Sequence, residues 1–133
     1  MEDILVGRLM SAPVETVAPD SLVEDAANLM LESGIGSVIV TDDDNQLRGI
    51  LTSTDFVRIV AERKPKDRTA VSEYMTTEVT TATAQDLVGD VAETMIEREI
   101  HHVPVVSAPD GVIGIVTTTD IAAYVSKLGE PRV

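Results

Sequence analysis

The sequence has no cysteine and no tryptophan, and it has only one phenylalanine and two tyrosines. Without cysteine, disulfide bonds and thiol chemistry are excluded. With so few aromatic rings, the hydrophobic content of 44% predicts a core of Val, Ile, Leu, Met and Ala. Composition of this kind is typical of a globular protein, since disordered chains combine low hydrophobicity with high charge.

Basic residues are also scarce. Lys and Arg number 10 against 23 Asp and Glu, which gives a formal net charge of −13, and the only lysines are Lys64, Lys66 and Lys127. Phosphate backbones and anionic membrane surfaces would repel such a chain, so we expect no nucleic-acid partner and no membrane partner. Acidity spread along the whole chain suggests a protein adapted to high salt. A thermal stability that did not rise between low salt and molar KCl would contradict this hypothesis.

No apolar run approaches the roughly 18 residues that a membrane-spanning helix needs. The first residues, MEDILVGRLM, carry acids where a secretory signal peptide has a basic start. We therefore expect a cytoplasmic protein.

The chain repeats itself. An offset of 65 positions places GILTSTD, Gly49–Asp55, on GIVTTTD, Gly114–Asp120, and the register holds without a gap. Other identities at this offset are Met10 with Met75, Val14 with Val79, Thr16 with Thr81, Leu22 with Leu87, Asp25 with Asp90, Met30 with Met95, Ile35 with Ile100 and Val38 with Val103. So long a match indicates an internal duplication, whose period lies above the range usual for solenoid repeats.

Each copy predicts the same elements. A short extended piece (14–17, 79–82) precedes an amphipathic helix, with apolar residues at helical spacing in 21–33 and 86–98. Ser21 and Glu24 predict a capping box at the start of the first helix, and Gly34 predicts its end. Two strands follow (37–41 and 47–52; 102–107 and 112–117), and a second helix closes each copy (53 to about 63; 118 to about 128). The sequence therefore predicts an α/β (α+β) fold of two β-α-β-β-α repeats.

The motifs resemble those of a known family. Each repeat has a lead-in that ends in methionine, LVGRLM or AVSEYM, and each closes with Gly, two apolar residues and Thr-x-x-Asp. Together, and in register, they resemble tandem CBS domains, the Bateman module, over nearly the whole chain. On this resemblance we expect one CBS domain at 7–63 and another at 72–128, joined by a linker at 64–71.

The resemblance implies a fold and a role. Family members form a pseudo-two-fold pair, often dimerised, whose clefts between the copies bind adenosyl compounds. The expected ligand is AMP, ADP or ATP first and S-adenosylmethionine second, with no catalytic cofactor. Such a module performs no reaction and regulates another protein, so the implied partners are an adenine nucleotide, a second copy and an unidentified regulated protein.

The Thr-x-x-Asp of each copy has two interpretations. Thr52 with Asp55, and Thr117 with Asp120, match a capping box ahead of an apolar helix, which requires no ligand. A helix N-terminus is also an anion site, where a threonine hydroxyl can donate to phosphate and, as in the family, the aspartate can accept from ribose hydroxyls. We predict ligand binding in at least one cleft, and Thr119 belongs to the same candidate motif.

The two copies differ just before their first long strand. The second has His101 and His102, where nucleotide-binding family members often place basic residues on the phosphate, and the first has Gly36 and Ser37. We therefore predict that the Asp120 cleft accepts the phosphate. The Asp55 cleft is predicted to be empty or to take an uncharged adenosine-like group. Because neighbouring strand residues face opposite sides, one histidine alone is able to reach the cleft.

Further candidates and alternatives remain. Thr16 and Thr81, on the short first strands, would line an adenine pocket by the resemblance, or serve as ordinary strand residues.

No metal site is predicted, because no histidine or cysteine cluster supplies a ligand set, and no nucleophile or phosphate-binding motif of an enzyme is present. The alternative to a ligand sensor is a module that dimerises or docks on a partner without any small ligand.

Overall fold

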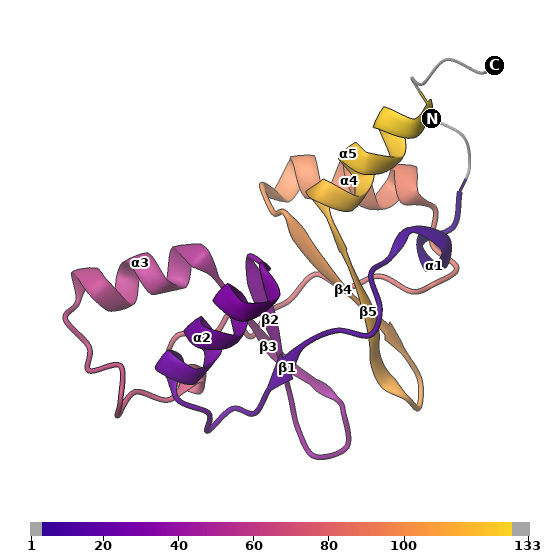
Figure 1. The fold of residues 1–133 in the computed structure, drawn as a ribbon. Coiled ribbons are helices and arrows are strands. Elements are labelled where there is room, and N and C mark those ends of the chain that lie inside the picture. Colours follow the sequence, from indigo (N-terminus) through magenta and orange to yellow (C-terminus); the bar gives the residue numbers. More distant parts are fainter. Residues whose placement is uncertain (1–3, 129–133) are drawn as a thin grey trace. The chain divides into compact units, whose positions relative to one another are not determined.

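The computed structural model describes residues 4–128, and its backbone divides into two compact units. We call Glu15–Val79 the Asp55 unit, and Met1–Val14 together with Thr80–Val133 the Asp120 unit. Figure 1 shows the helices and strands of both units. Each unit is mixed α/β, so the predicted fold class is confirmed.

The Asp55 unit is built on a three-stranded sheet. Strand β1 (Thr16–Val17) pairs in parallel with β2 (Ser37–Thr41), which pairs antiparallel with β3 (Leu47–Thr52). Helices α2 (Val23–Ser33) and α3 (Ser53–Ala61) and the 3-10 turn η1 (Val71–Glu73) complete the unit. Every residue of β2 is buried, as expected for a short apolar strand covered on both faces. The buried core comprises Val23, Ala26, Met30, Val38, Val40, Leu51, Ile59, Val71 and Tyr74.

The ends of α2 show one prediction confirmed and one wrong. Gly34 ends the helix in the left-handed conformation, with φ of 63°, which glycine adopts without strain. The helix starts only at Val23, and no side chain caps it. The Ser21 oxygen instead accepts the Ala18 N–H at 3.0 Å and closes the preceding turn, so the predicted capping box of Ser21 and Glu24 does not form.

The Asp120 unit repeats the arrangement with a two-stranded antiparallel sheet. Strands β4 (His102–Ser107) and β5 (Gly111–Thr117) lie with helices α4 (Val88–Arg98) and α5 (Thr118–Leu128), and the short helix α1 (Val6–Leu9) packs here too. The stretch predicted as a strand at 79–82 forms only an isolated parallel bridge, Ala82 to Val105. The buried core comprises Val6, Ala82, Val88, Val91, Met95, Val103, Val105 and Val116.

Each lead-in packs against the body of the other sequence repeat. Ser11 bridges to Ile115 of β5, and Thr76 bridges to Ile50 of β3, with backbone hydrogen bonds in both directions in each case. A side chain in place of Gly114 would meet the Met10 sulfur, and one in place of Gly49 the Met75 sulfur. The compact units therefore do not follow the sequence repeats, because residues 4–14 complete the sheet of the second repeat and 71–79 that of the first.

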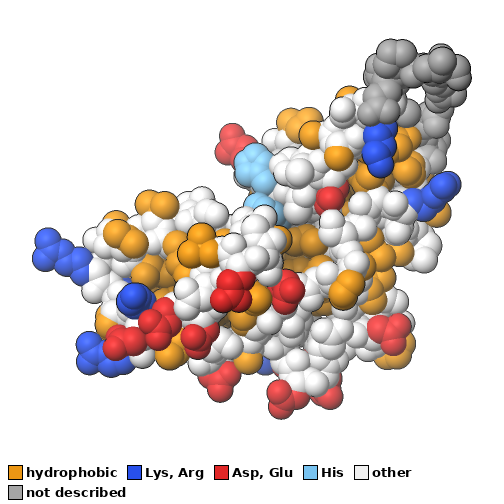
Figure 2. Space-filling model, in the orientation of Figure 1, with side chains coloured by type: hydrophobic (Ala, Val, Ile, Leu, Met, Phe, Trp, Pro, Cys, Tyr) orange, Lys and Arg blue, Asp and Glu red, His pale blue; other side chains and the backbone are white. Residues whose placement is uncertain are grey.

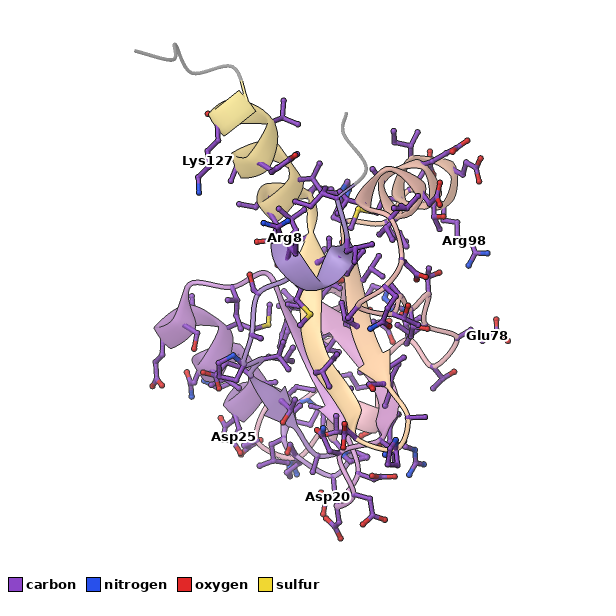
Figure 3. All side chains as sticks on the ribbon, turned by 90° about the vertical axis from the view of Figure 1, so that its right-hand side faces the viewer. Arg8, Asp20, Asp25, Glu78, Arg98 and Lys127 are labelled. Carbon is purple, nitrogen blue, oxygen red and sulfur yellow. The ribbon has the colours of Figure 1, made fainter. Side chains whose placement is uncertain are left out.

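The charged side chains labelled in Figure 3 point away from the strands: Arg8, Asp20, Asp25, Glu78, Arg98 and Lys127. Ion pairs are few, and among residues 4–128 two are formed, by Arg58 with Asp55 and by Arg68 with Asp67. Within the same residues, no helix combines the length and the apolar character that a membrane crossing requires.

Candidate functional site

The Thr-x-x-Asp motif caps a helix in both units. In the Asp120 unit, the Thr117 N–H and hydroxyl both donate to one oxygen of Asp120, at 2.9 and 3.1 Å, and the Asp120 N–H donates back to the Thr117 oxygen at 3.2 Å. In the Asp55 unit, Thr52 donates to one oxygen of Asp55 in the same way, at 2.8 and 3.4 Å. The cap thus uses one carboxylate oxygen and leaves the other for a second partner.

The second oxygen of Asp120 contacts the lead-in. The Ser11 hydroxyl donates to it at 3.0 Å, across 109 positions of sequence. Ser11 is exposed and Asp120 is half-buried, so this carboxylate lies at the surface of its unit. A neutral, exposed hydroxyl is a partner that another hydroxyl can replace, because the exchange leaves no buried polar group unsatisfied.

The second oxygen of Asp55 is held by a charge. The Arg58 guanidinium, one turn further along α3, forms an ion pair and hydrogen bond with it. Arg58 also lies 5.9 Å from the centre of the Tyr74 ring and donates to the Tyr74 carbonyl at 3.4 Å. The Tyr74 hydroxyl donates to Glu62 at 2.9 Å. Asp55 itself is only 4% exposed, so its carboxylate is enclosed by partners from its own unit.

The residues before β2 and β4 meet the closing helices. His102 is the register partner of Thr117, and Ser37 is that of Thr52, so each pair shares one face of its sheet. The Gly36 carbonyl accepts the Ser53 N–H at 3.3 Å, and the His101 carbonyl accepts the Thr118 N–H at 3.0 Å. The predicted residues Thr117, Asp120 and His102 therefore come together in one unit, and Thr52, Asp55 and Ser37 in the other.

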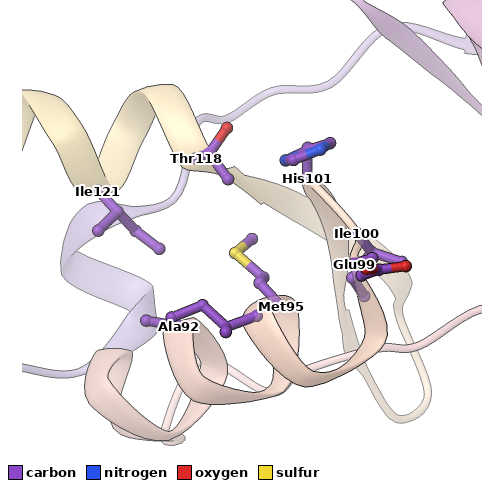
Figure 4. A pocket seen from close by; sticks show the side chains of 8 residues that line it. Ala92, Met95, Glu99, Ile100, His101, Thr118 and Ile121 are labelled. Atoms are coloured by element: carbon purple, nitrogen blue, oxygen red, sulfur yellow. The ribbon is translucent and has the colours of Figure 1, made fainter.

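The two histidines occupy different places. His101 is exposed and lines an apolar hollow of about 550 Å³ between α4 and α5, where Figure 4 shows it across from Thr118. His102 is half-buried, and this burial, followed by the nearby charge of His101, lowers the pKa of His102. Both imidazoles reach the surface, where they are pale blue in Figure 2. His102 is the histidine that neighbours Thr117.

Of the remaining predicted residues, Thr119 lies within a capping motif and the two others lie away from the caps. Thr119 is exposed on the first turn of α5, next to Asp120. Thr16 is exposed on β1, in register with Ile39. Thr81 borders a hollow of about 250 Å³ whose other polar lining is Thr80, Asp86, Asp90 and Thr94. Its two aspartates make that hollow unsuited to a phosphate.

The sequence analysis did not identify Ser11 and Arg58, which contact the second carboxylate oxygens of Asp120 and Asp55. Ser11 carries no local signal, because its contact depends on the lead-in crossing to β5. Arg58 had a signal, since an acid and a base three positions apart on a helix are neighbours. The repeat alignment also shows Ala123 where Arg58 stands, and Lys127 where Glu62 stands. Among residues 4–128, no cluster of three or more His, Asp or Glu side chains is arranged to hold a metal ion.

A family model for the CBS domain matches the chain twice, at residues 6–62 and 71–127. The chain belongs to the CBS-domain family. Its CBS repeats resemble a solved CBS domain pair of protein MJ0100 in complex with 5'-methylthioadenosine and S-adenosyl-L-methionine, at 31% identity and a TM-score of 0.88, over 96% of this chain and 99% of that one. A putative signal-transduction protein with CBS domains from Burkholderia ambifaria MC40-6 gives 27% identity and a TM-score of 0.87, over 98% and 99% of the two chains.

Two curated relatives differ in how much of their own length the match covers. An uncharacterized 17.7 kDa protein of Acidianus ambivalens is 30% identical over 95% of this chain and 79% of its own length. Homoserine O-acetyltransferase of Methanosalsum zhilinae is 33% identical, with 91% of this chain covered, but the match takes in only 24% of that enzyme. The chain therefore spans about a quarter of such an enzyme.

Proposed function

We propose that this CBS pair is a ligand-sensing module that binds an adenosyl compound at Asp120 and regulates a separate partner protein. In this proposal the chain performs no reaction, acts in the cytoplasm, and consists of CBS repeats at 7–63 and 72–128 joined by 64–71. The observation that carries the proposal is the Asp120 carboxylate, which keeps one oxygen at the surface with a single exchangeable hydroxyl partner.

The chemistry of the motif suits a nucleoside. The Asp120 oxygen that accepts from Ser11 can accept from ribose hydroxyls instead. At the first turn of α5 the Thr118 and Asp120 N–H groups already have partners, so the hydroxyls of Thr118 and Thr119 are the groups offered to an anion. His102, beside Thr117, is the cationic group that we assign to a phosphate. Burial lowers the pKa of His102. A phosphate dianion beside the imidazole would raise this pKa again, because a nearby negative charge favours the imidazolium.

The class of ligand is supported by the MJ0100 pair, whose solved complex holds two adenosyl compounds. For this chain we place AMP, ADP or ATP first, because His102 favours a phosphate. We place S-adenosylmethionine second, because the MJ0100 pair was solved in complex with it.

Thermal melting at high KCl tests the proposal directly. AMP, ATP and S-adenosylmethionine are each added to the protein, with GTP as the control that lacks adenine. A ligand present at a hundred times its Kd stabilises the native state by about 2.7 kcal/mol, which raises the Tm by several degrees. We expect a shift with an adenosyl ligand that Asp120→Ala abolishes. No shift with any of the three would refute the proposal.

A second candidate function is a homodimeric interaction module, and exposed apolar residues favour it. Leu31 on α2 is 82% exposed, and Ile96, its equivalent on α4, is 79% exposed. Val60 and Val125 are a second equivalent pair of exposed side chains, on α3 and α5. Their recurrence at equivalent positions of both repeats is the observation that favours an interface with a second chain.

The two candidates are separable by experiment. We expect sedimentation analysis to show a dimer that becomes monomeric in the double variant Leu31→Glu, Ile96→Glu, with Glu97→Gln on α4 as the control. A wild-type monomer at all concentrations would contradict the dimer. Ligand binding that survives in the monomeric variant would show that sensing does not depend on association.

A further inference from the structure

The two closing motifs have the same local structure but different second partners for the aspartate. Asp120 has a serine hydroxyl there, and Asp55 has the Arg58 guanidinium. Counting the threonine contacts, three donors meet each carboxylate. The difference is therefore one of charge and burial and not of the number of hydrogen bonds.

Arg58 is fixed by more than its ion pair. The Tyr74 ring lies under the guanidinium, and the Tyr74 carbonyl accepts from the same nitrogen that contacts Asp55. Tyr74 is itself positioned by the bond from its hydroxyl to Glu62. The guanidinium adds the attraction of opposite charges to its hydrogen bond, which a neutral ribose hydroxyl does not supply, so ribose hydroxyls compete poorly with this arrangement.

The Asp120 unit lacks every member of this cluster except the aspartate. At the offset of 65, Arg58 corresponds to Ala123, Glu62 to Lys127 and Tyr74 to Leu9. None of the three replacements is able to hold a cation against Asp120: Ala123 has no charge, Leu9 offers no π face, and Lys127 would repel an arginine. The cluster is thus a property of the Asp55 unit, since all three of its other positions carry different residues in the Asp120 unit.

We infer that Arg58 sets the ligand stoichiometry: by occupying the Asp55 carboxylate it leaves the chain with one adenosyl site, at Asp120. This inference rests on the proposed function, since it takes the aspartate of the closing motif to be the ribose acceptor. Arg58 is a specificity-determining residue because it blocks one of two motifs that are otherwise alike.

Calorimetric titration of the full chain with AMP, and separately with S-adenosylmethionine, measures the number of sites. The variant Arg58→Met removes the charge and keeps an unbranched side chain over the Tyr74 ring. We expect one site in the wild type, lost in Asp120→Ala, and two sites in Arg58→Met, the second lost when Asp55→Asn is added. Arg48→Ala, which removes an exposed arginine of β3, is the matched control and should keep one site.

A mirror variant keeps the test decisive if Arg58→Met does not fold. Ala123→Arg combined with Lys127→Glu builds the ion pair into the second repeat, and we expect it to weaken binding at Asp120 about tenfold or more. The inference would be overturned if this mirror variant bound the ligand with wild-type affinity, or if the wild type had two sites. It would also be overturned if a folded Arg58→Met protein had only one site or bound AMP more weakly than the wild type.

Failure of the proposed function is a different result. If the wild type binds neither ligand, the proposal for Asp120 fails, and Arg58→Met then tests only whether Arg58 blocks a site at Asp55. A site that appears in that variant and depends on Asp55 supports it, and no new site overturns it.

Discussion

The Asp55 unit and the Asp120 unit descend from one repeat and close with the same seven-residue pattern, but their closing aspartates have different surroundings. Asp55 is buried and bonded to Thr52 and Arg58, whereas Asp120 is half-buried and meets an exposed serine. A duplicated motif can therefore keep its role as a helix cap in both copies while only one copy keeps a carboxylate that a ligand is able to reach.

We expect the largest difference in stability between the two units from substitutions at Gly49 and Gly114, where the lead-ins pack against the strands. A methyl group added in Gly49→Ala would lie 2.8 Å from the Thr76 carbonyl, a backbone atom, besides the Met75 side chain. In Gly114→Ala the contact under 3 Å is the flexible Met10 sulfur, and the Ser11 carbonyl is 3.1 Å away. We expect Gly49→Ala to lose about 1–3 kcal/mol in chemical denaturation, and Gly114→Ala to lose less.

Gly89→Ala is the control for that comparison. Nothing lies within 4 Å of the added methyl group, and the residue is helical, so alanine should stabilise the protein by about 0.4–1 kcal/mol. Equal losses for Gly49→Ala and Gly114→Ala would show that the two lead-ins pack with the same freedom.

Removing the helix caps should have the next largest effect on the free energy of unfolding. Without ligand, Asp55→Ala and Asp120→Ala each remove a cap, and the loss for a cap is about 0.5–2 kcal/mol. We expect Asp55→Ala to lie at the upper end, because it opens a buried position and leaves Arg58 without its partner, and Asp120→Ala at the lower end. Urea denaturation of both variants measures the difference. A larger loss for Asp120→Ala would break the assignment of Asp55 as the structural member of the pair.

His102 adds a pH dependence that Ser37, its equivalent, does not have. Burial lowers the pKa of His102 in the folded protein below the ordinary 6.5, so the unfolded chain binds the proton more readily. The stability that this histidine contributes is present above about pH 6.5 and is lost as the pH falls toward the folded pKa. We expect His102→Ser to flatten the fall in Tm from neutral to mildly acidic pH.

The same histidine should couple ligand binding to protons. If His102 contacts the phosphate, the affinity for AMP rises as the pH falls toward 6, by at most about tenfold per pH unit, and the affinity for adenosine does not. Titrations of wild type and His102→Ser at several pH values check this. A pH dependence that persists in His102→Ser would assign the proton to another group.

The smallest effect concerns Tyr74, whose equivalent in the Asp120 unit is Leu9. Burial, and then the hydrogen bond to Glu62, raise the pKa of Tyr74 above 10. In the variant Tyr124→Phe, absorbance at alkaline pH reports Tyr74 alone, and we expect Glu62→Gln to lower its midpoint. A midpoint unchanged by Glu62→Gln would show that burial alone sets it. Because the folded pKa is raised, the stability linked to this phenol is lost as the pH rises through that value.

Local features of the fold were predictable from the sequence. The four long strands lie within one residue of their predicted ranges, and Gly34 ends its helix, because side-chain alternation and left-handed backbone are local properties. The Ser21 cap was wrong because a nearby turn competed for the same oxygen. At the site, the Thr117–Asp120 pair was predictable from spacing, and the choice of His102 over His101 beside Thr117 required the strand register.

The sequence by itself determined the duplication, the order of the elements and the two helix caps, since each depends on residues a few positions apart. Tertiary structure alone decided that the lead-in with Ser11 reaches Asp120 and that the one with Tyr74 supports Arg58. The physical reason is that burial and the choice of partner for a charge depend on segments brought together from far along the chain. Two identical local motifs therefore acquire different chemistry from the residues packed against them.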